Sequence, residues 1–266
     1  MPTRELTRTL WGLGASGVRT PRIRRLLWHA GAMPDLTRDG DVYVLDLGSD
    51  ENRFNPEWVG AVRAAVDEVV AAEGPRALVT TATGKFFSNG LDLDWMAGHL
   101  PALEGFMVEV HALFARVLGA GVVSVAAIQG HCFAAGAMLA MAQDQRVMRA
   151  DRGFFCLPEA DIRIQFTPGM GALLQARLAP QTAHVAMATG RRFGGQEAVA
   201  AGIVDEAVGA ELVLGRAKEL AAARAGSDPV TLEAIKRQMY APALALLEDP
   251  AANPIALPGL TGAPAG

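Results

Sequence analysis

Two short turns built from small residues, at positions 88–92 and 130–136, constrain the fold of this chain most. Each turn follows a strand-like apolar run and precedes a helix-like segment. Backbone N–H groups at the start of a helix have no partner within that helix, so two such turns can direct N–H groups at one developing negative charge. The pattern predicts an α/β domain with a polar site at its strand-to-helix junctions.

Strands and helices alternate on both sides of these turns. Apolar and β-branched runs predict strands at 42–47, 77–81 and 122–128. Asn55 followed by Pro56 is typical of a helix start, and residues 103–118 have helical spacing. After residue 169 the pattern is mostly helical and ends with one predicted helix over 229–247, which indicates helices that cover an α/β core.

The predicted organisation has four parts. Residues 1–33 form a basic extension, with six arginines before residue 33 opposed only by Glu5, and we predict that the domain does not need it. Targeting, attachment to a membrane surface and disorder are all open for this extension. Residues 34–205 form the core, residues 206–248 form a helical region, and residues 249–266, rich in Pro, Ala and Gly, form a disordered tail.

Composition excludes several classes of protein. A formal net charge of −4 argues against a general nucleic-acid binder. Cys132 and Cys156 lack the spacing of metal ligands, which favours free thiols in a reducing compartment. The chain has neither a long apolar run typical of a spanning helix nor a secretory signal. We therefore expect a cytoplasmic protein without a metal, a nucleic-acid partner or a membrane partner.

One acidic residue follows the two turns at a position suited to proton transfer. Glu159 comes after an apolar stretch and Pro158, and a dry site would raise its basicity. The N–H groups at Leu91 and near Ala135 would suit an oxygen that becomes negative when a proton leaves the adjacent carbon. On spacing alone, close packing of small residues and a solvated glutamate is the favoured interpretation.

A series of motifs favours the catalytic interpretation over close packing. It comprises residues 51–56, 84–93, 130–136, 148–154 leading to 159–162, and 198–205. Because these motifs occur in this order, the chain from about residue 36 to 208 resembles the crotonase superfamily, which contains the enoyl-CoA hydratases and isomerases. The resemblance implies a spiral of ββα units with a C-terminal helical trimerisation region, assembled as a homotrimer or a dimer of trimers. It also implies an acyl-CoA thioester substrate, and no cofactor apart from the coenzyme A of that substrate.

The resemblance also implies roles for individual residues. The N–H groups of Leu91 and Ala135 correspond to the family's oxyanion hole, and Glu159 corresponds to the glutamate that hydratases and isomerases share. Met138 stands where hydratases carry a second glutamate. Hydration uses two carboxylates, whereas moving a double bond needs one base that takes a proton at C2 and returns it at C4. The motifs therefore look most like the plant and peroxisomal type of Δ3,Δ2-enoyl-CoA isomerase.

Two departures bear on this interpretation. Arg163 occupies a position that is commonly glycine in the family, so either its backbone is conventional or its side chain projects toward the acyl pocket or a neighbouring subunit. We include Arg163 with Met138 as a candidate pocket residue. In an extended segment Asp161 would face the same way as Glu159 and restore a two-acid site, although a structural role for Asp161 is favoured.

Two alternatives are open at this point. One is an enoyl-CoA hydratase, or another crotonase-type enzyme, that uses Asp161 or water alone. The other is a non-catalytic oligomeric subunit that binds acyl-CoA. Candidate partners for the coenzyme A phosphates are Arg53, Lys85, Lys236 and Arg237.

Overall fold

A computed structural model describes residues 34–255. The predicted extension at 1–33 and the final part of the predicted tail, 256–266, lie outside the described residues. No helix in the described part is both long and apolar enough to cross a membrane.

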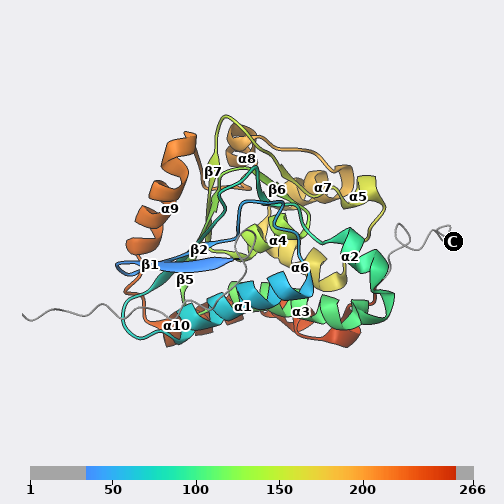
Figure 1. Cartoon of the computed structure of the whole chain (residues 1–266), viewed down its shortest axis with the longest axis horizontal. Helices are drawn as coiled ribbons and strands as arrows, with labels where there is room; N and C mark the ends of the chain where they lie inside the picture. Colours follow the sequence, from blue (N-terminus) through green and yellow to red (C-terminus); the bar gives the residue numbers. More distant parts are fainter. Residues whose placement is uncertain (1–33, 256–266) are drawn as a thin grey trace, which may run out of the picture.

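A six-stranded sheet forms the centre of the molecule (Figure 1). Its strand order is β1 (Asp35–Asp39), β2 (Val42–Asp46), β3 (Ala77–Thr81), β5 (Val123–Ile128), β7 (Gln145–Arg149) and β9 (Glu206–Val208). β1 pairs antiparallel with β2, and every later pair is parallel. β9 falls within the predicted helical region 206–248, yet it is the last strand of the core sheet, because it pairs with β7.

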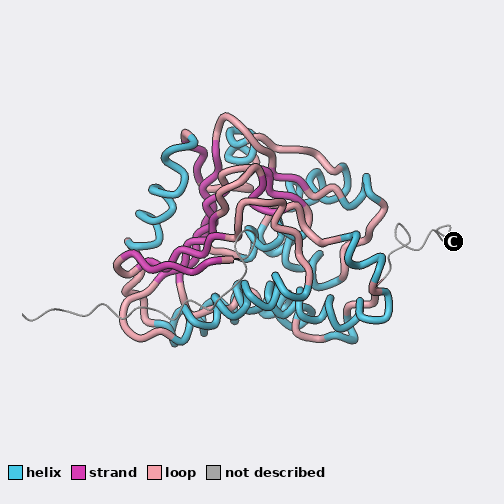
Figure 2. Tube along the Cα trace, viewed as in Figure 1, coloured by secondary structure: helices cyan, strands magenta, loops and turns pink. Residues whose placement is uncertain are grey.

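A second, three-stranded sheet lies beside the first. It contains β4 (Phe86–Ser88), β6 (His131–Phe133) and β8 (Phe155–Cys156), all parallel. Each of these strands follows one strand of the large sheet, so the chain passes from β3 to β4, from β5 to β6 and from β7 to β8 before each helical segment. This repeated ββα order confirms the predicted spiral, whose two groups of strands are visible in Figure 2.

Helices cover both faces of the large sheet. α1 (Pro56–Ala71) begins where predicted: the Asn55 side chain accepts a hydrogen bond from Trp58 N–H at 2.9 Å. α1 packs against α3 (Leu103–Leu118), and both contribute to the larger buried apolar cluster. α9 (Val213–Ala222) covers the opposite face, where its alanines meet valines of the strands in a second cluster (Figure 1).

The helix that carries the second small-residue turn is enclosed by protein. All eight residues of α4 (Ala135–Ala142) are buried, as its alanine-rich and methionine-rich composition allows. The remaining helices are α2 (Leu93–Gly98), η1 (Leu100–Ala102), α5 (Glu159–Ile162), α6 (Pro168–Arg177), α7 (Pro180–Thr189), α8 (Gly195–Ala200), η2 (Ala210–Leu212), α10 (Pro229–Met239), α11 (Ala241–Leu247) and η3 (Pro250–Ala252).

Two predictions about the C-terminal part are wrong. The helix predicted over 229–247 is divided into α10 and α11 at Tyr240, because Pro242 lies in the first turn of α11 and cannot continue the hydrogen-bond ladder of α10. Residues 249–255 of the predicted disordered tail have a defined structure, since they contain η3 and the buried Asn253.

Candidate active site

The two small-residue turns meet, and two glycines allow their close approach. A Cβ on Gly90 would lie 2.7 Å from Ala134 Cβ and 3.1 Å from Ala135 N. A Cβ on Gly136 would lie 2.5 Å from Ser88 Cβ. The two Cβ–Cβ distances, 2.7 Å and 2.5 Å, are too short for real side chains, so glycine is required at each position. Close packing of the small residues is therefore what brings the two turns together.

Where the turns meet, the N–H groups of Leu91 and Ala135 have no acceptor in the described part of the chain. Phe54 pairs with the chain on either side of Leu91: its N–H donates to Gly90 O at 2.8 Å and its carbonyl accepts from Asp92 N–H at 2.9 Å. This pairing directs Leu91 N–H away from Phe54. Ala135 is the first residue of α4, where an N–H has no partner inside the helix. Within residues 34–255, neither N–H donates a hydrogen bond.

Glu159 begins α5 and its carboxyl group is withdrawn from water. The residue is 5% exposed, and Oε2 has no hydrogen-bond partner among the described residues. Burial disfavours the charged carboxylate and raises the pKa of Glu159 to about 7. The group is therefore suited to both accepting and returning a proton near neutral pH.

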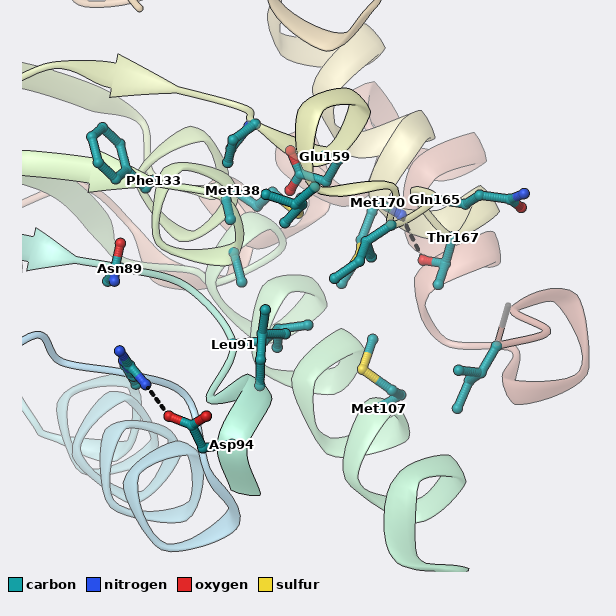
Figure 3. A pocket seen from close by; sticks show the side chains of 18 residues that line it. Asn89, Leu91, Asp94, Met107, Phe133, Met138, Glu159, Gln165, Thr167 and Met170 are labelled. Carbon is teal, nitrogen blue, oxygen red and sulfur yellow. Dashed lines mark hydrogen bonds and ion pairs between the residues drawn. The ribbon is translucent and has the colours of Figure 1, made fainter. Parts of the chain in front are cut away.

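A cavity of about 340 Å³ joins these groups. Leu91, Ala135 and Glu159 all line it, so the structure brings the predicted oxyanion-hole residues and the predicted base to one site. In Figure 3, Asn89 and Phe133 lie on one side of Leu91 and Glu159, and Thr167 and Gln165 lie on the other.

The cavity is polar on one side and largely apolar on the other. Arg53, Asn89 and Asp94 form a polar group, in which Arg53 Nη1 donates to Asp94 at 2.8 Å. Apolar side chains line much of the rest, among them Met107, Met138, Ile164, Met170 and Ile255. A ligand with one polar end and one apolar end would match this division.

Met138 lines the same cavity as Glu159, so this position supplies a thioether and no second carboxylate. It belongs to α4, one turn after Ala135, and it is buried. Among the described residues lining the cavity, the other carboxylate is Asp94, whose side chain is 91% exposed and paired with Arg53. The cavity therefore contains one buried acid within the described part of the chain.

Asp161 does not form a second acid in this cavity. The segment at 159–162 is helical instead of extended, so residues two apart point in different directions. The Asp161 carboxylate lies against Gly190, where an added Cβ would be 2.6 Å from Oδ2. This position agrees with the structural role favoured for Asp161.

The structure corrects the expectations for Arg163. Its backbone is left-handed instead of conventional, with φ 59° and ψ 36°, in the region that favours glycine. Arg163 caps the C-terminal end of α5, is exposed, and does not line the cavity. The prediction that it lines the acyl pocket is therefore wrong within this chain, because the left-handed helix end leaves the side chain at the surface.

The candidate phosphate partners lie in different places. Arg53 lines the cavity, whereas Lys85 is exposed beside the Phe86 ring. Lys236 is 4% exposed and donates to Asp144 Oδ2 at 2.7 Å, so it is a structural residue and cannot reach a coenzyme A phosphate. Arg237 pairs with Glu248 at 2.9 Å on another surface.

Sequence reasoning missed a buried polar pair at the cavity wall. Thr167 Oγ1 lies 2.7 Å from His111 Nε2 on α3, and burial lowers the pKa of His111 to about 4, which keeps the ring neutral. Thr167 also caps α6, accepting from Met170 N–H at 3.3 Å. The Thr167-Pro168 pair is a readable helix start. No local pattern joins it to His111, which lies 56 residues earlier.

Metal ligands do not cluster in the described part of the chain. Between residues 34 and 255, no group of three or more His, Cys, Asp or Glu side chains is arranged to hold a metal ion. Cys132 and Cys156 are buried free thiols.

Comparison with known proteins identifies the family. Residues 42–252 match the family model described as enoyl-CoA hydratase/isomerase. The chain belongs to the enoyl-CoA hydratase/isomerase family. It is thus an enzyme with the crotonase fold, and its family acts on acyl-CoA thioesters.

Relatives within the family include isomerases and a dehydratase. Enoyl-CoA delta isomerase 3 of Arabidopsis thaliana is 35% identical over 182 residues, which span 66% of this chain and 76% of the relative. The peroxisomal enoyl-CoA delta isomerase 2 of the same plant is 33% identical, over 66% and 77%. Carnitinyl-CoA dehydratase of Escherichia coli K12 is 35% identical, over 60% and 61%.

Solved structures of similar proteins have the same fold. The apo enoyl-CoA isomerase of Mycobacterium tuberculosis is 27% identical with a TM-score of 0.75, covering 80% of this chain and 93% of that one. Human mitochondrial delta3-delta2-enoyl-CoA isomerase is 26% identical, also with a TM-score of 0.75, covering 80% and 85%.

Proposed function

We propose that this enzyme isomerises 3-enoyl-CoA to 2-enoyl-CoA, with Glu159 as the single proton-transfer group. The observation that carries the proposal is the set of groups in the cavity. Two N–H groups that donate no hydrogen bond within residues 34–255, at Leu91 and Ala135, share it with one buried carboxylate. Met138 lines the same cavity, at the position where the family resemblance assigns the hydratases' second acid. The similarity to plant enoyl-CoA delta isomerases supports the same reaction.

The proposed reaction proceeds through a thioester dienolate. The ionised Glu159 carboxylate takes a proton from C2, and the electrons of the broken C–H bond move onto the thioester oxygen. The N–H groups of Leu91 and Ala135 stabilise the negative charge on that oxygen. When the electrons return from the oxygen, the C1=O bond forms again and the C1=C2 pair becomes the C2=C3 double bond. The pair of the former C3=C4 bond takes the proton of the Glu159 carboxylic acid at C4. The proton that Glu159 takes from C2 is the one that it returns to C4, so no second acid is needed.

The polarity of the cavity orients the substrate in this proposal. The charged coenzyme A portion lies toward Arg53 and Asn89, and the acyl chain lies toward Met107 and Met170. Burial of the chain against these methionines excludes water from C2 and C4. A dry site also protects the dienolate from protonation by solvent.

A paired assay with a 3-enoyl-CoA and a 2-enoyl-CoA tests the proposed reaction. We expect wild-type enzyme to isomerise 3-hexenoyl-CoA and Glu159→Gln to lose about 10³-fold in kcat while acyl-CoA affinity is retained, because the amide cannot act as a base. Asp161→Asn is the matched control, since Asp161 lies outside the cavity lining. Full activity of Glu159→Gln would overturn the proposal.

The same assay distinguishes the two other candidate functions. Similarity to carnitinyl-CoA dehydratase favours addition or removal of water as the second candidate, and rapid hydration of crotonyl-CoA would support it. Tight acyl-CoA binding without turnover of either thioester would support a non-catalytic subunit.

In the isomerase, deuterium placed at C2 should appear in part at C4, because one carboxyl group carries it between the two carbons.

The proposal includes the assembly and location of the enzyme. We infer a homotrimer, or a dimer of trimers, because family resemblance assigns the C-terminal helices to trimerisation. Light scattering would measure the mass of three or six chains. The two free thiols support a reducing, cytoplasmic location.

A further inference from the structure

After α11 the chain turns back across the start of α6. We call residues 249–255 the C-terminal strap. Within it, Asn253 is 6% exposed and accepts a hydrogen bond from Gly169 N–H through Oδ1 at 2.8 Å. The amide nitrogen of Asn253 donates to the carbonyl oxygens of Leu246 at 2.6 Å and Asp249 at 2.9 Å. The buried side chain of Asn253 thus joins the strap to α6 and to α11.

Gly169 permits the close approach of the strap. A Cβ at this position would lie 2.9 Å from Asn253 Oδ1 and 3.2 Å from Leu247 Cα. Gly169 is also the second residue of α6, where an N–H has no acceptor within the helix. Asn253 supplies that acceptor from a distant part of the chain. The strap is therefore held in one position relative to α6.

This position brings Ile255 to the cavity. Gly169 lies between Thr167 and Met170, two residues of the cavity wall. Ile255 lines the same cavity and packs against the larger buried apolar cluster. In Figure 3, Thr167 lies on the other side of Leu91 and Glu159 from Asn89. Because Asn253, two residues earlier, is held at Gly169 beside Thr167, we infer that Ile255 lies in the part of the cavity that is remote from the polar group at Arg53.

We propose that the C-terminal strap sets the length of acyl chain that the cavity accepts. Ile255 is the specificity-determining residue, and Asn253 is the positioning residue that holds it there. The match to the family model ends at residue 252, so both residues lie beyond the part of the chain that defines the family. The inference rests on the proposed function for the orientation of the acyl chain, which places its far end against Ile255.

Binding of saturated acyl-CoA thioesters tests this inference without requiring turnover. Isothermal titration of the full chain with butanoyl-, hexanoyl-, octanoyl-, decanoyl- and dodecanoyl-CoA gives the affinity gained by each added pair of carbons. Each buried methylene should raise affinity about fourfold until the chain reaches Ile255. The same series is measured for Ile255→Ala, Ile255→Trp and Asn253→Ala. Ala251→Ser, on the exposed part of the strap, is the matched control.

We expect Ile255→Trp to shorten the preferred acyl chain, and Ile255→Ala and Asn253→Ala to lengthen it. Ile255→Trp should weaken binding of the longest thioester that wild type accepts by at least about fourfold relative to butanoyl-CoA. Ile255→Ala and Asn253→Ala should strengthen binding of the next longer thioester relative to butanoyl-CoA, while Ala251→Ser keeps the wild-type profile. A merely destabilising change would weaken all lengths alike, which the ratio to butanoyl-CoA detects.

The outcomes separate this inference from the proposed function. An unchanged length profile in all three variants, with isomerase activity present, overturns the inference alone. A shifted profile in an enzyme that does not isomerise 3-enoyl-CoA supports the inference and overturns the proposed reaction. Absence of binding to every thioester overturns both.

Discussion

At the scale of single residues, burial gives Glu159 the properties of a reversible base. A solvated glutamate is almost fully ionised at pH 7 and is a weak base. Removing Glu159 from water raises its pKa to about 7, because no partner in the described residues compensates for the lost hydration of Oε2. The same group is then a stronger base when ionised and a usable acid when protonated.

The raised pKa predicts the pH dependence of isomerisation. The reaction begins with the ionised carboxylate, so kcat/KM should rise about tenfold per pH unit below pH 7 and level off above it. The measurement is kcat/KM for 3-hexenoyl-CoA across this range, with Asp161→Asn as the control that should keep the profile. A profile that is flat down to pH 5.5 would contradict Glu159 as the base with the pKa of about 7 that its burial produces.

At the scale of elements, α4 is held at both ends. Its start packs against the other turn through Gly136 and Ser88. At its end, Arg177 of α6 donates through Nε to Met141 O at 2.9 Å and through Nη2 to Gln143 O at 2.7 Å. These contacts keep Ala135 N–H in place relative to Leu91, which is the requirement for two donors to act on one oxygen.

Substitution of Gly90 should separate the two turns. In Gly90→Ala the new Cβ would meet Ala134 Cβ at 2.7 Å, and the backbone at φ 83° disfavours any side chain. We expect kcat for 3-hexenoyl-CoA to fall by about 10²-fold, because displacement of one oxyanion donor weakens stabilisation of the dienolate.

A second glycine provides the control for this substitution. Gly60 lies on the exposed side of α1 and has open space around it, so Gly60→Ala should leave kcat unchanged and stabilise the helix by about 1 kcal/mol. Wild-type kcat in a folded Gly90→Ala enzyme would show that the spacing of the turns does not limit catalysis.

At the scale of the whole molecule, one buried lysine joins the C-terminal helices to the core. Lys236 on α10 donates to Val122 O at 2.8 Å and to Asp144 at 2.7 Å. Burial lowers the pKa of Lys236, although the attraction of Asp144 opposes this effect. Asp144 also accepts from Ser124 N–H at 2.8 Å, so the lysine completes a network around the start of β5.

Loss of this lysine should weaken the whole fold. Lys236→Met leaves Asp144 and Val122 O without their partner, and we expect the free energy of unfolding in urea to fall by about 3 kcal/mol. Arg237→Met, the neighbouring substitution in an exposed ion pair, should have a much smaller effect. Equal stability of the two variants would show that α10 does not depend on the buried contact.

Much of the fold could be predicted from local patterns, whereas three of the candidate site residues could be predicted only from the order of the family's motifs. The strand at 77–81 and the helix at 103–118 occur as predicted, because periodic burial is written into neighbouring residues. Leu91, Ala135 and Glu159 lie at one cavity, as motif order indicated. Pro242 is a local sign that the helix predicted over 229–247 divides, since proline cannot continue the hydrogen-bond ladder of α10.

The sequence by itself determined the strands and helices with local periodicity, the two small-residue turns and the absence of an acid at Met138, since each depends on residues close together in the chain. The order of the family's motifs implied the spiral of ββα units. Only the tertiary structure decided that Asp161 faces Gly190, that Lys236 is buried, and that Asn253 brings Ile255 to the cavity. The physical reason is that the local pattern specifies which apolar residues are buried, but not whether a charged side chain is buried or which distant residue is the partner of a polar side chain.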